Sequence, residues 1–137
     1  MPPFFLLSLL GLLAGPAPAP PAPGTHYLGT FSNGAKGDTL SFVLAPDGQT
    51  ISDLKFKGYW RCGGTLVPLP AGGPRGTYTV ASGRIAGRLC QEGGNCFELS
   101  GRVAGAAANG KLRLTNRAQR CDSNELVWSA VATKPTK

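Results

Sequence analysis

The sequence predicts an all-β fold: a single antiparallel, up-and-down sheet of about eight strands that forms a small closed or partly open barrel with two disulfides. Three observations support this prediction. Apolar and polar residues alternate with a period of two along several short segments, as in half-buried strands. Glycine-containing turns separate these segments, and no stretch has the period of a helix. Eight is also a number of strands at which a sheet can close with its edges paired.

The chain divides into a leader and one domain. It has 137 residues and a formal net charge of +7, but residues 1–24 carry no charged side chain. Phe4 to Ala14 is an apolar run of about eleven residues, too short to span a membrane as a helix and typical of a secretory signal peptide. We expect cleavage after Gly24, which leaves 25–137 as a single secreted or periplasmic domain without a transmembrane span. The alternative is that the leader is retained as an anchor.

Turn residues separate the predicted strands. In chain order the strands cover 27–32, 39–45, 50–62, 77–81, 84–90, 96–103, 111–116 and 125–133. The first ends before a Ser-Asn-Gly turn. The second places Leu40, Phe42 and Leu44 on one face. Asp47-Gly48 then reverses the chain, because Asp-Gly readily adopts the positive φ of a tight hairpin.

The third predicted strand has the clearest alternation. Apolar residues and a glycine occupy one face and basic or aromatic residues the other: Leu54, Phe56, Gly58, Trp60 and Cys62 against Lys55, Lys57, Tyr59 and Arg61. The following segment, 63–76, has three prolines and five glycines, so we expect one long mobile loop there. The short strand after it, Thr77 to Ala81, has Tyr78 and Val80 inward and ends at a Ser-Gly turn.

Segments 84–90 and 96–103 predict an antiparallel hairpin in which facing residue numbers add up to 186. This register places Leu89 opposite Phe97 on the apolar face. On the other face it places Cys90 opposite Cys96, as a disulfide, and pairs the charges of Arg88 and Glu98. One register therefore satisfies both faces, which chance rarely achieves.

The last two strands follow from a second hairpin and from Trp128. Asn109-Gly110 is predicted to close the hairpin into 111–116, and 125–133 supplies the final strand. Once Cys90 and Cys96 are assigned to each other, Cys62 pairs with Cys121. Two disulfides are expected in an exported chain of this size. A zinc site is not expected, since the chain has a single histidine and no C-x-x-C pair.

The sequence offers little for catalysis or for a cofactor, so we expect neither. The only histidine, His26, stands near the mature N-terminus, and most Asp residues sit in or beside turns. Glu92 and Glu125 have no assigned role, and two carboxylates on separate turns make a weak case for a glycosidase. A small hydrolase would require these three side chains to share one pocket.

Binding of an acidic partner is easier to support. Eight basic residues fall on the polar phase of their strands and are candidates for one basic face: Lys55, Lys57, Arg61, Arg84, Arg88, Arg102, Lys111 and Arg113. Tyr59 adds an exposed aromatic ring. Such a face would attract lipopolysaccharide, anionic polysaccharide or extracellular DNA without sequence specificity. The alternative is an exterior that is basic for solubility alone.

A small ligand inside the sheet is a second possibility. Phe42, Phe56, Trp60 and Trp128 are the candidates to line the mouth of a barrel, although eight strands leave little free space once side chains fill the interior. We therefore expect a non-catalytic binding or interaction module. The alternative is a secreted enzyme inhibitor that presents the 63–76 loop.

The first three predicted strands resemble the opening of avidin-like or lipocalin-like barrels. The resemblance rests on Gly-Thr-Phe at 29–31, the alternating TLSFVLA, the Asp-Gly turn and ISDLKFKG, about a quarter of the chain. It implies architecture only, and biotin binding is not implied. Small exported bacterial proteins of unassigned function have a similar overall pattern: a signal segment, a Gly-Thr-Phe opening, a Cys after the third strand, and a late Cys ahead of a Val-Trp-Ser-Ala strand. The periplasmic lysozyme inhibitors share its size and expected disulfides, but an inhibitor of a basic lysozyme should be acidic.

Overall fold

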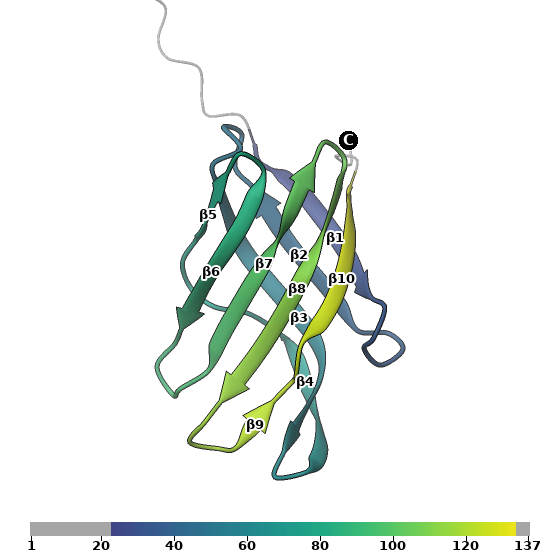
Figure 1. Ribbon diagram of the computed structural model, residues 1–137, viewed down its shortest axis with the longest axis vertical. Coiled ribbons are helices and arrows are strands. Elements are labelled where there is room, and N and C mark those ends of the chain that lie inside the picture. The colour runs from purple at the N-terminus through teal and green to yellow at the C-terminus, as the bar shows by residue number, and fades with distance from the viewer. Residues whose placement is uncertain (1–22, 134–137) are drawn as a thin grey trace, which may run out of the picture.

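The computed structural model describes residues 23–133, which form one antiparallel sheet of ten strands and contain no helix (Figure 1). The strands are β1 (Thr25–Phe31), β2 (Thr39–Leu44), β3 (Thr50–Cys62), β4 (Thr65–Gly72), β5 (Tyr78–Ala81), β6 (Arg84–Cys90), β7 (Cys96–Ala104), β8 (Ala107–Asn116), β9 (Cys121–Asp122) and β10 (Leu126–Ala132). The all-β antiparallel class is confirmed. The predicted leader lies outside the described residues except for Pro23 and Gly24, and β1 begins directly after the predicted cleavage site.

Eight of these strands pair into a closed ring. The pairings run β1, β2, β3, β5, β6, β7, β8, β10, and β10 pairs again with β1. The two strands that the sequence did not predict lie off this ring: β4 pairs with β3, and β9 bridges β8 and β3. The strand pairing of the ring is shortest at β5, where two residues pair with β3 and two with β6.

The predicted hairpin of β6 and β7 is confirmed residue by residue. Leu89 faces Phe97, Arg88 faces Glu98 and Cys90 faces Cys96. Both predicted disulfides are present, Cys90–Cys96 within this hairpin and Cys62–Cys121 between the end of β3 and β9. Two disulfides are compatible with an exported protein in an oxidising compartment.

The predicted long loop at 63–76 is wrong, because most of it is strand β4. Gly63 and Gly64, with φ of 57° and 87°, form a two-residue turn of the type that closes tight hairpins. Hydrogen-bonded and non-hydrogen-bonded pairs alternate from this turn as far as Leu69, so the nitrogen of Pro68 faces the unpaired side of β4, whereas Pro70 lies where the register shifts by one residue. Proline is tolerated on such an edge, and it removes donors with which another chain could pair. The inhibitor hypothesis therefore loses the loop on which it rested.

The predicted turn at Asn109-Gly110 is also wrong. The chain reverses at Gly105, and Ala104 faces Ala107. Gly110 lies inside β8 for reasons of space, since a Cβ atom there would lie 1.9 Å from the backbone oxygen of Ser100. Gly110 faces Gly101 on one side and Trp128 on the other, so the two glycines leave room for the indole ring.

The interior of the ring is filled by side chains from nearly every strand. Phe42 lies at its centre, with its ring 5.0 Å from that of Tyr27 and 5.6 Å from that of Trp128. Phe56 packs edge-on against Phe31. Phe42, Phe56, Trp60 and Trp128, the four predicted interior residues, all belong to this buried cluster. The Trp128 indole nitrogen has no hydrogen-bond partner there.

Tyr78 gives a prediction for alkaline pH. Its hydroxyl donates to the Phe97 carbonyl oxygen at 2.8 Å, and burial raises the pKa of this phenol above its ordinary value. An unfolded chain ionises this group from about pH 10, while the folded protein keeps it neutral. The free energy of unfolding should therefore fall above about pH 10, by up to about 1.4 kcal/mol per pH unit.

Urea unfolding at pH 8, 10 and 11 measures this effect, with Tyr78→Phe as the test and the more exposed Tyr59→Phe as the control. Tyr78→Phe should flatten the decline and cost about 1 kcal/mol at pH 8, because the Phe97 carbonyl loses its donor. The explanation fails if the free energy of unfolding of Tyr78→Phe falls as steeply between pH 8 and pH 11 as that of the wild type.

Candidate anion-binding site

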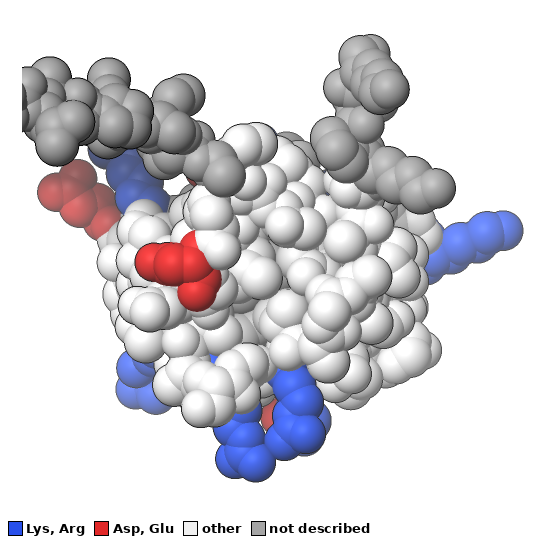
Figure 2. Space-filling view, turned by 90° about the horizontal axis from the view of Figure 1, so that it is seen from above, with Lys and Arg blue, Asp and Glu red and all other residues white. Residues whose placement is uncertain are grey.

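The structure divides the eight predicted basic residues into two groups. Five extend from the outer face of β6, β7 and β8: Arg84, Arg88, Arg102, Lys111 and Arg113. The other three, Lys55, Lys57 and Arg61, lie on β3, which the ring separates from β6 by β5. Figure 2 shows basic side chains gathered on one side of the molecule and standing singly at others, around an end that carries few charges.

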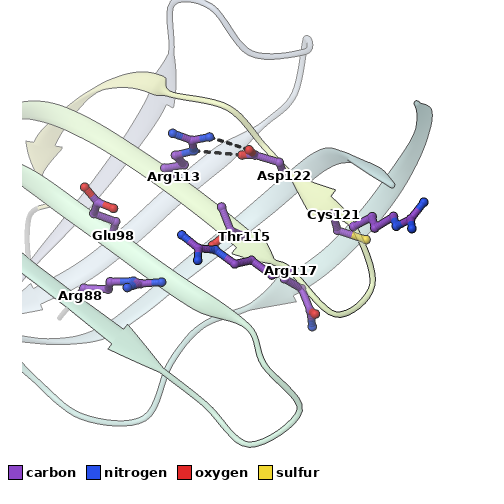
Figure 3. A pocket seen from close by; sticks show the side chains of 9 residues that line it. Arg88, Glu98, Arg113, Thr115, Arg117, Cys121 and Asp122 are labelled. Carbon is purple, nitrogen blue, oxygen red and sulfur yellow. Dashed lines mark hydrogen bonds and ion pairs between the residues drawn. The ribbon is translucent and has the colours of Figure 1, made fainter. Parts of the chain in front are cut away.

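At one end of the first group, four arginines line a pocket of about 410 Å³, which we call the arginine pocket. It is lined by Arg88, Arg113, Arg117 and Arg120, by the carboxylates Glu98 and Asp122, and by Thr115, Asn116 and Cys121. Figure 3 shows Arg88 beside Glu98, Arg117 beside Thr115, and Arg113 turned toward Asp122. Two of the four arginines come from strands and two from the turn between β8 and β9.

Hydrogen bonds of buried Asn116 and of the backbone fix the turn 117–120 between β8 and β9. The Asn116 amide donates to the Gly93 carbonyl and to Asn95 Oδ1, and its oxygen accepts the Gln119 N–H. The Arg120 N–H donates to the Arg117 carbonyl, and the Cys62–Cys121 disulfide follows immediately. This turn is therefore held at both ends, and it projects two arginines beside the sheet.

Sequence reasoning missed Arg117 and Arg120. They lie between predicted strands, so they have no strand phase to mark them as outward residues. The signal that was available is their closeness to Cys121: a disulfide fixes that residue, and so limits where the preceding turn can lie.

Asp122 neutralises one arginine of the pocket. Arg113 donates to Asp122 through Nε at 3.1 Å and through one terminal nitrogen at 2.6 Å, a bidentate geometry. Its hydrogen bonds and charge lower the pKa of Asp122, and the same contact raises the pKa of Arg113. Asp122 therefore stays ionised at lower pH than an ordinary Asp carboxyl, and the bidentate contact orients Arg113.

The other three arginines are free of such partners. Glu98 faces Arg88 across one strand and Arg113 across the other, but it forms an ion pair with neither. Within residues 23–133, ion pairs join only Arg113 to Asp122 and Lys111 to Glu125. Arg88, Arg117 and Arg120 are exposed and can turn their donors toward an anion.

The β3 group forms a different surface. Tyr59 is 39% exposed, and the Arg61 guanidinium donates to the Gly64 carbonyl at 3.4 Å, across the turn into β4. Register places Arg61 opposite Asp122 of β9. No second basic strand lies next to β3, so its cations are spread along one strand.

A third surface is mostly apolar and is bordered by Lys111, which faces Val127 across β8 and β10. Leu28, Val127 and Val131 are exposed on β1 and β10, among small residues that include Ser129 and Ala107. This apolar surface therefore adjoins the first basic group at Lys111.

The residues considered for catalysis do not share a site. His26 lies on β1 at the end of the ring where β10 finishes, whereas Glu92 lies at the other end, in the turn between β6 and β7. Glu125 pairs with Lys111. Residues 23–133 contain no group of three or more His, Cys, Asp and Glu suited to a metal ion.

Among the described residues, no helix is long and apolar enough to cross a membrane. Comparisons of the chain with protein-family models, with curated proteins and with solved structures found no match.

Proposed function

We propose that this chain is an exported, non-catalytic binding module whose arginine pocket holds the anionic groups of an acidic polysaccharide. The observation that carries the proposal is that Arg88, Arg117 and Arg120, which form no ion pair within residues 23–133, line one pocket together with the oriented Arg113. Sulfate, phosphate and carboxylate groups accept paired hydrogen bonds from guanidinium groups. The pocket supplies several such donors on one exposed surface.

Charge pattern further supports a polymer as the ligand. Arg84 and Arg102 face each other directly on neighbouring strands of the same outer surface. Like charges in that position destabilise a sheet, and an anion lying across both would relieve the repulsion. A polyanion that occupies the arginine pocket can extend along β6 and β7 to this pair.

The proposed setting is the periplasm or the extracellular space, where the disulfides are stable and acidic polysaccharides are accessible. Binding that depends on exposed cations is weakened by salt. Lipopolysaccharide and DNA present similar phosphate groups, so direct comparison with a sulfated polysaccharide decides among them.

The test is binding of fluorescein-labelled heparin at low and moderate salt by the triple variant Arg88→Gln/Arg117→Gln/Arg120→Gln. We expect about 10- to 100-fold weaker binding, since each exposed charged contact contributes about 0.5 to 1 kcal/mol. The matched control is Lys36→Gln/Lys55→Gln/Lys57→Gln, which removes the same charge away from the pocket. Double-stranded DNA and lipopolysaccharide serve as competitors.

Equal weakening by the two triple variants would show that net charge, and not the pocket, attracts heparin. If the wild type does not bind labelled heparin even at low salt, anion binding is rejected altogether. All six positions are exposed, so urea midpoints close to that of the wild type are expected and verify folding.

A further inference from the structure

The ring closes through the short strand β5, and the strand pairing leaves an opening between β6 and β4, which lies off the ring. Strand β5 pairs with β6 only at Arg84 and Ile85, and with β3 only at Thr50 and Ile51. Within the described residues, no strand pairs with the remainder of β6 on that side. Strand β4 lies at the opposite end of the molecule from β5, and only the segment 73–77 joins them (Figure 1).

A pocket of about 400 Å³ occupies this opening, and we call it the side pocket. The floor of the side pocket is formed by Phe56, Phe97 and Leu114, which come from three strands and belong to the buried core. Leu69 and Pro70 of β4 supply an apolar wall. An apolar group placed here would lie against Leu69 and Pro70 above the buried side chains, and hydrophobic contact with this lining would favour its binding.

The polar rim of the side pocket is held in place by hydrogen bonds. The Arg75 N–H donates to Gln91 Oε1 at 3.0 Å, and the Gln91 amide donates to the Arg75 carbonyl at 3.3 Å. This reciprocal pair fastens the segment 73–77 to the turn between β6 and β7. Gly73 lies against the Leu54 carbonyl so closely that a Cβ atom would overlap it. The rim is preorganised, which lowers the cost of ordering it when a ligand binds.

The side pocket is lined by a single charged residue. Arg75 is the one charged residue among those that line it, and no carboxylate lines it. The Arg75 side chain is exposed and forms no ion pair within residues 23–133. The arginine pocket, in contrast, combines four arginines with two carboxylates. One pocket suits a strongly anionic polymer, and the other suits a single negative charge attached to an apolar body.

We propose that the side pocket binds a small apolar acid, a molecule with one carboxylate or sulfonate group at the rim and a medium-length acyl chain or a single aromatic ring inside. Its volume is near the lower end for small-molecule sites, which excludes bulky polycyclic ligands. The acid group pairs with Arg75, and the apolar body rests on Phe56, Phe97 and Leu114. This site is separate from the arginine pocket and does not depend on the function proposed for it.

Isothermal titration calorimetry with octanoate and with 4-phenylbutyrate tests the proposal, and 1-octanol serves as the uncharged comparison. We expect saturable binding of at least one acid with a Kd below about 1 mM. Leu69→Asp, which introduces a like charge into the apolar wall, should weaken binding about tenfold or more. Leu66→Asp is the matched control on the same strand, because Leu66 is exposed and lies outside the side pocket.

Arg75→Gln tests the charged contact separately. It should weaken octanoate several-fold and leave 1-octanol unchanged, because the alcohol has no charge to pair. Arg117→Gln/Arg120→Gln should leave the binding of both ligands unchanged, which distinguishes the two pockets. Near-UV circular dichroism and urea midpoints verify that each variant is folded. The proposal is overturned if neither acid binds the wild type saturably, or if Leu69→Asp and Leu66→Asp have equal effects.

Discussion

Replacing Cys62 and Cys121 together by alanine is expected to lower the free energy of unfolding by about 4 kcal/mol, and replacing Cys90 and Cys96 together by about 2 kcal/mol. The two bonds close loops of very different length, with sequence separations of 59 and 6 residues. In the chain-entropy account, a longer closed loop removes more freedom from the unfolded chain. Urea denaturation of the two double variants measures the difference.

The same pair of variants links the fold to the arginine pocket. Cys121 lines that pocket, and Asp122 beside it orients Arg113. Loss of Cys62–Cys121 should therefore also weaken heparin binding under conditions where the protein stays folded, whereas loss of Cys90–Cys96 should weaken it less. Equal losses of stability in the two variants would contradict the loop-length argument. Unchanged heparin binding would show that β9 stays in place without its disulfide.

Gly110→Ala is expected to destabilise the protein by about 3 kcal/mol or more, although it adds a single methyl group. That methyl group would lie 1.9 Å from the Ser100 carbonyl oxygen and 2.5 Å from the Cα atom of Gly101. Backbone atoms cannot move aside as a flexible side chain can. Strands β7 and β8 would have to separate, and Trp128 would lose the space in which its indole lies. Thermal or urea unfolding measures the effect.

Gly72→Ala is the matched control for this prediction. Gly72 also lies in a strand, but a Cβ atom there would have only the Pro70 carbonyl oxygen nearby, at 3.9 Å. This variant should stay within about 0.5 kcal/mol of the wild type. If Gly110→Ala were equally mild, the close approach of β7 and β8 at this point would be wrong.

The hairpin of β6 and β7 shows how much the sequence predicted. A single register placed apolar residues on one face and paired Cys90 with Cys96 on the other, and the structure has that register. Local alternation was sufficient because the two strands are neighbours in the chain and five residues connect them. The Cys62–Cys121 bond followed by elimination. The hypotheses on ligand, compartment and lack of catalysis, and the resemblance to avidin-like barrels, stay predictions.

Two errors had one cause, which is that local turn signals do not reveal tertiary context. Pro68 and Pro70 suggested a loop, because proline is rare in strands whose two edges are paired. Within residues 23–133, β4 has one unpaired edge and a register shift after Leu69, and proline is accommodated at both. Asn109-Gly110 suggested a turn, but Gly110 is needed where β8 passes close to β7. In each case the residue met a requirement set by a neighbour distant in sequence.

The candidate site likewise combines features that the sequence predicted with features that depend on tertiary structure. The sequence by itself determined the strand class, the inward and outward phases, the Cys90–Cys96 disulfide and the outward position of Arg88 and Arg113, because these follow from period two and from a pairing near in the chain. The Cys62–Cys121 disulfide then followed by elimination. Only the tertiary structure decided that Arg117 and Arg120 join them, that Lys55 and Lys57 lie apart, and that the ring opens beside β4. These features depend on which distant strands become neighbours when the sheet closes, and that information is not contained in any local pattern.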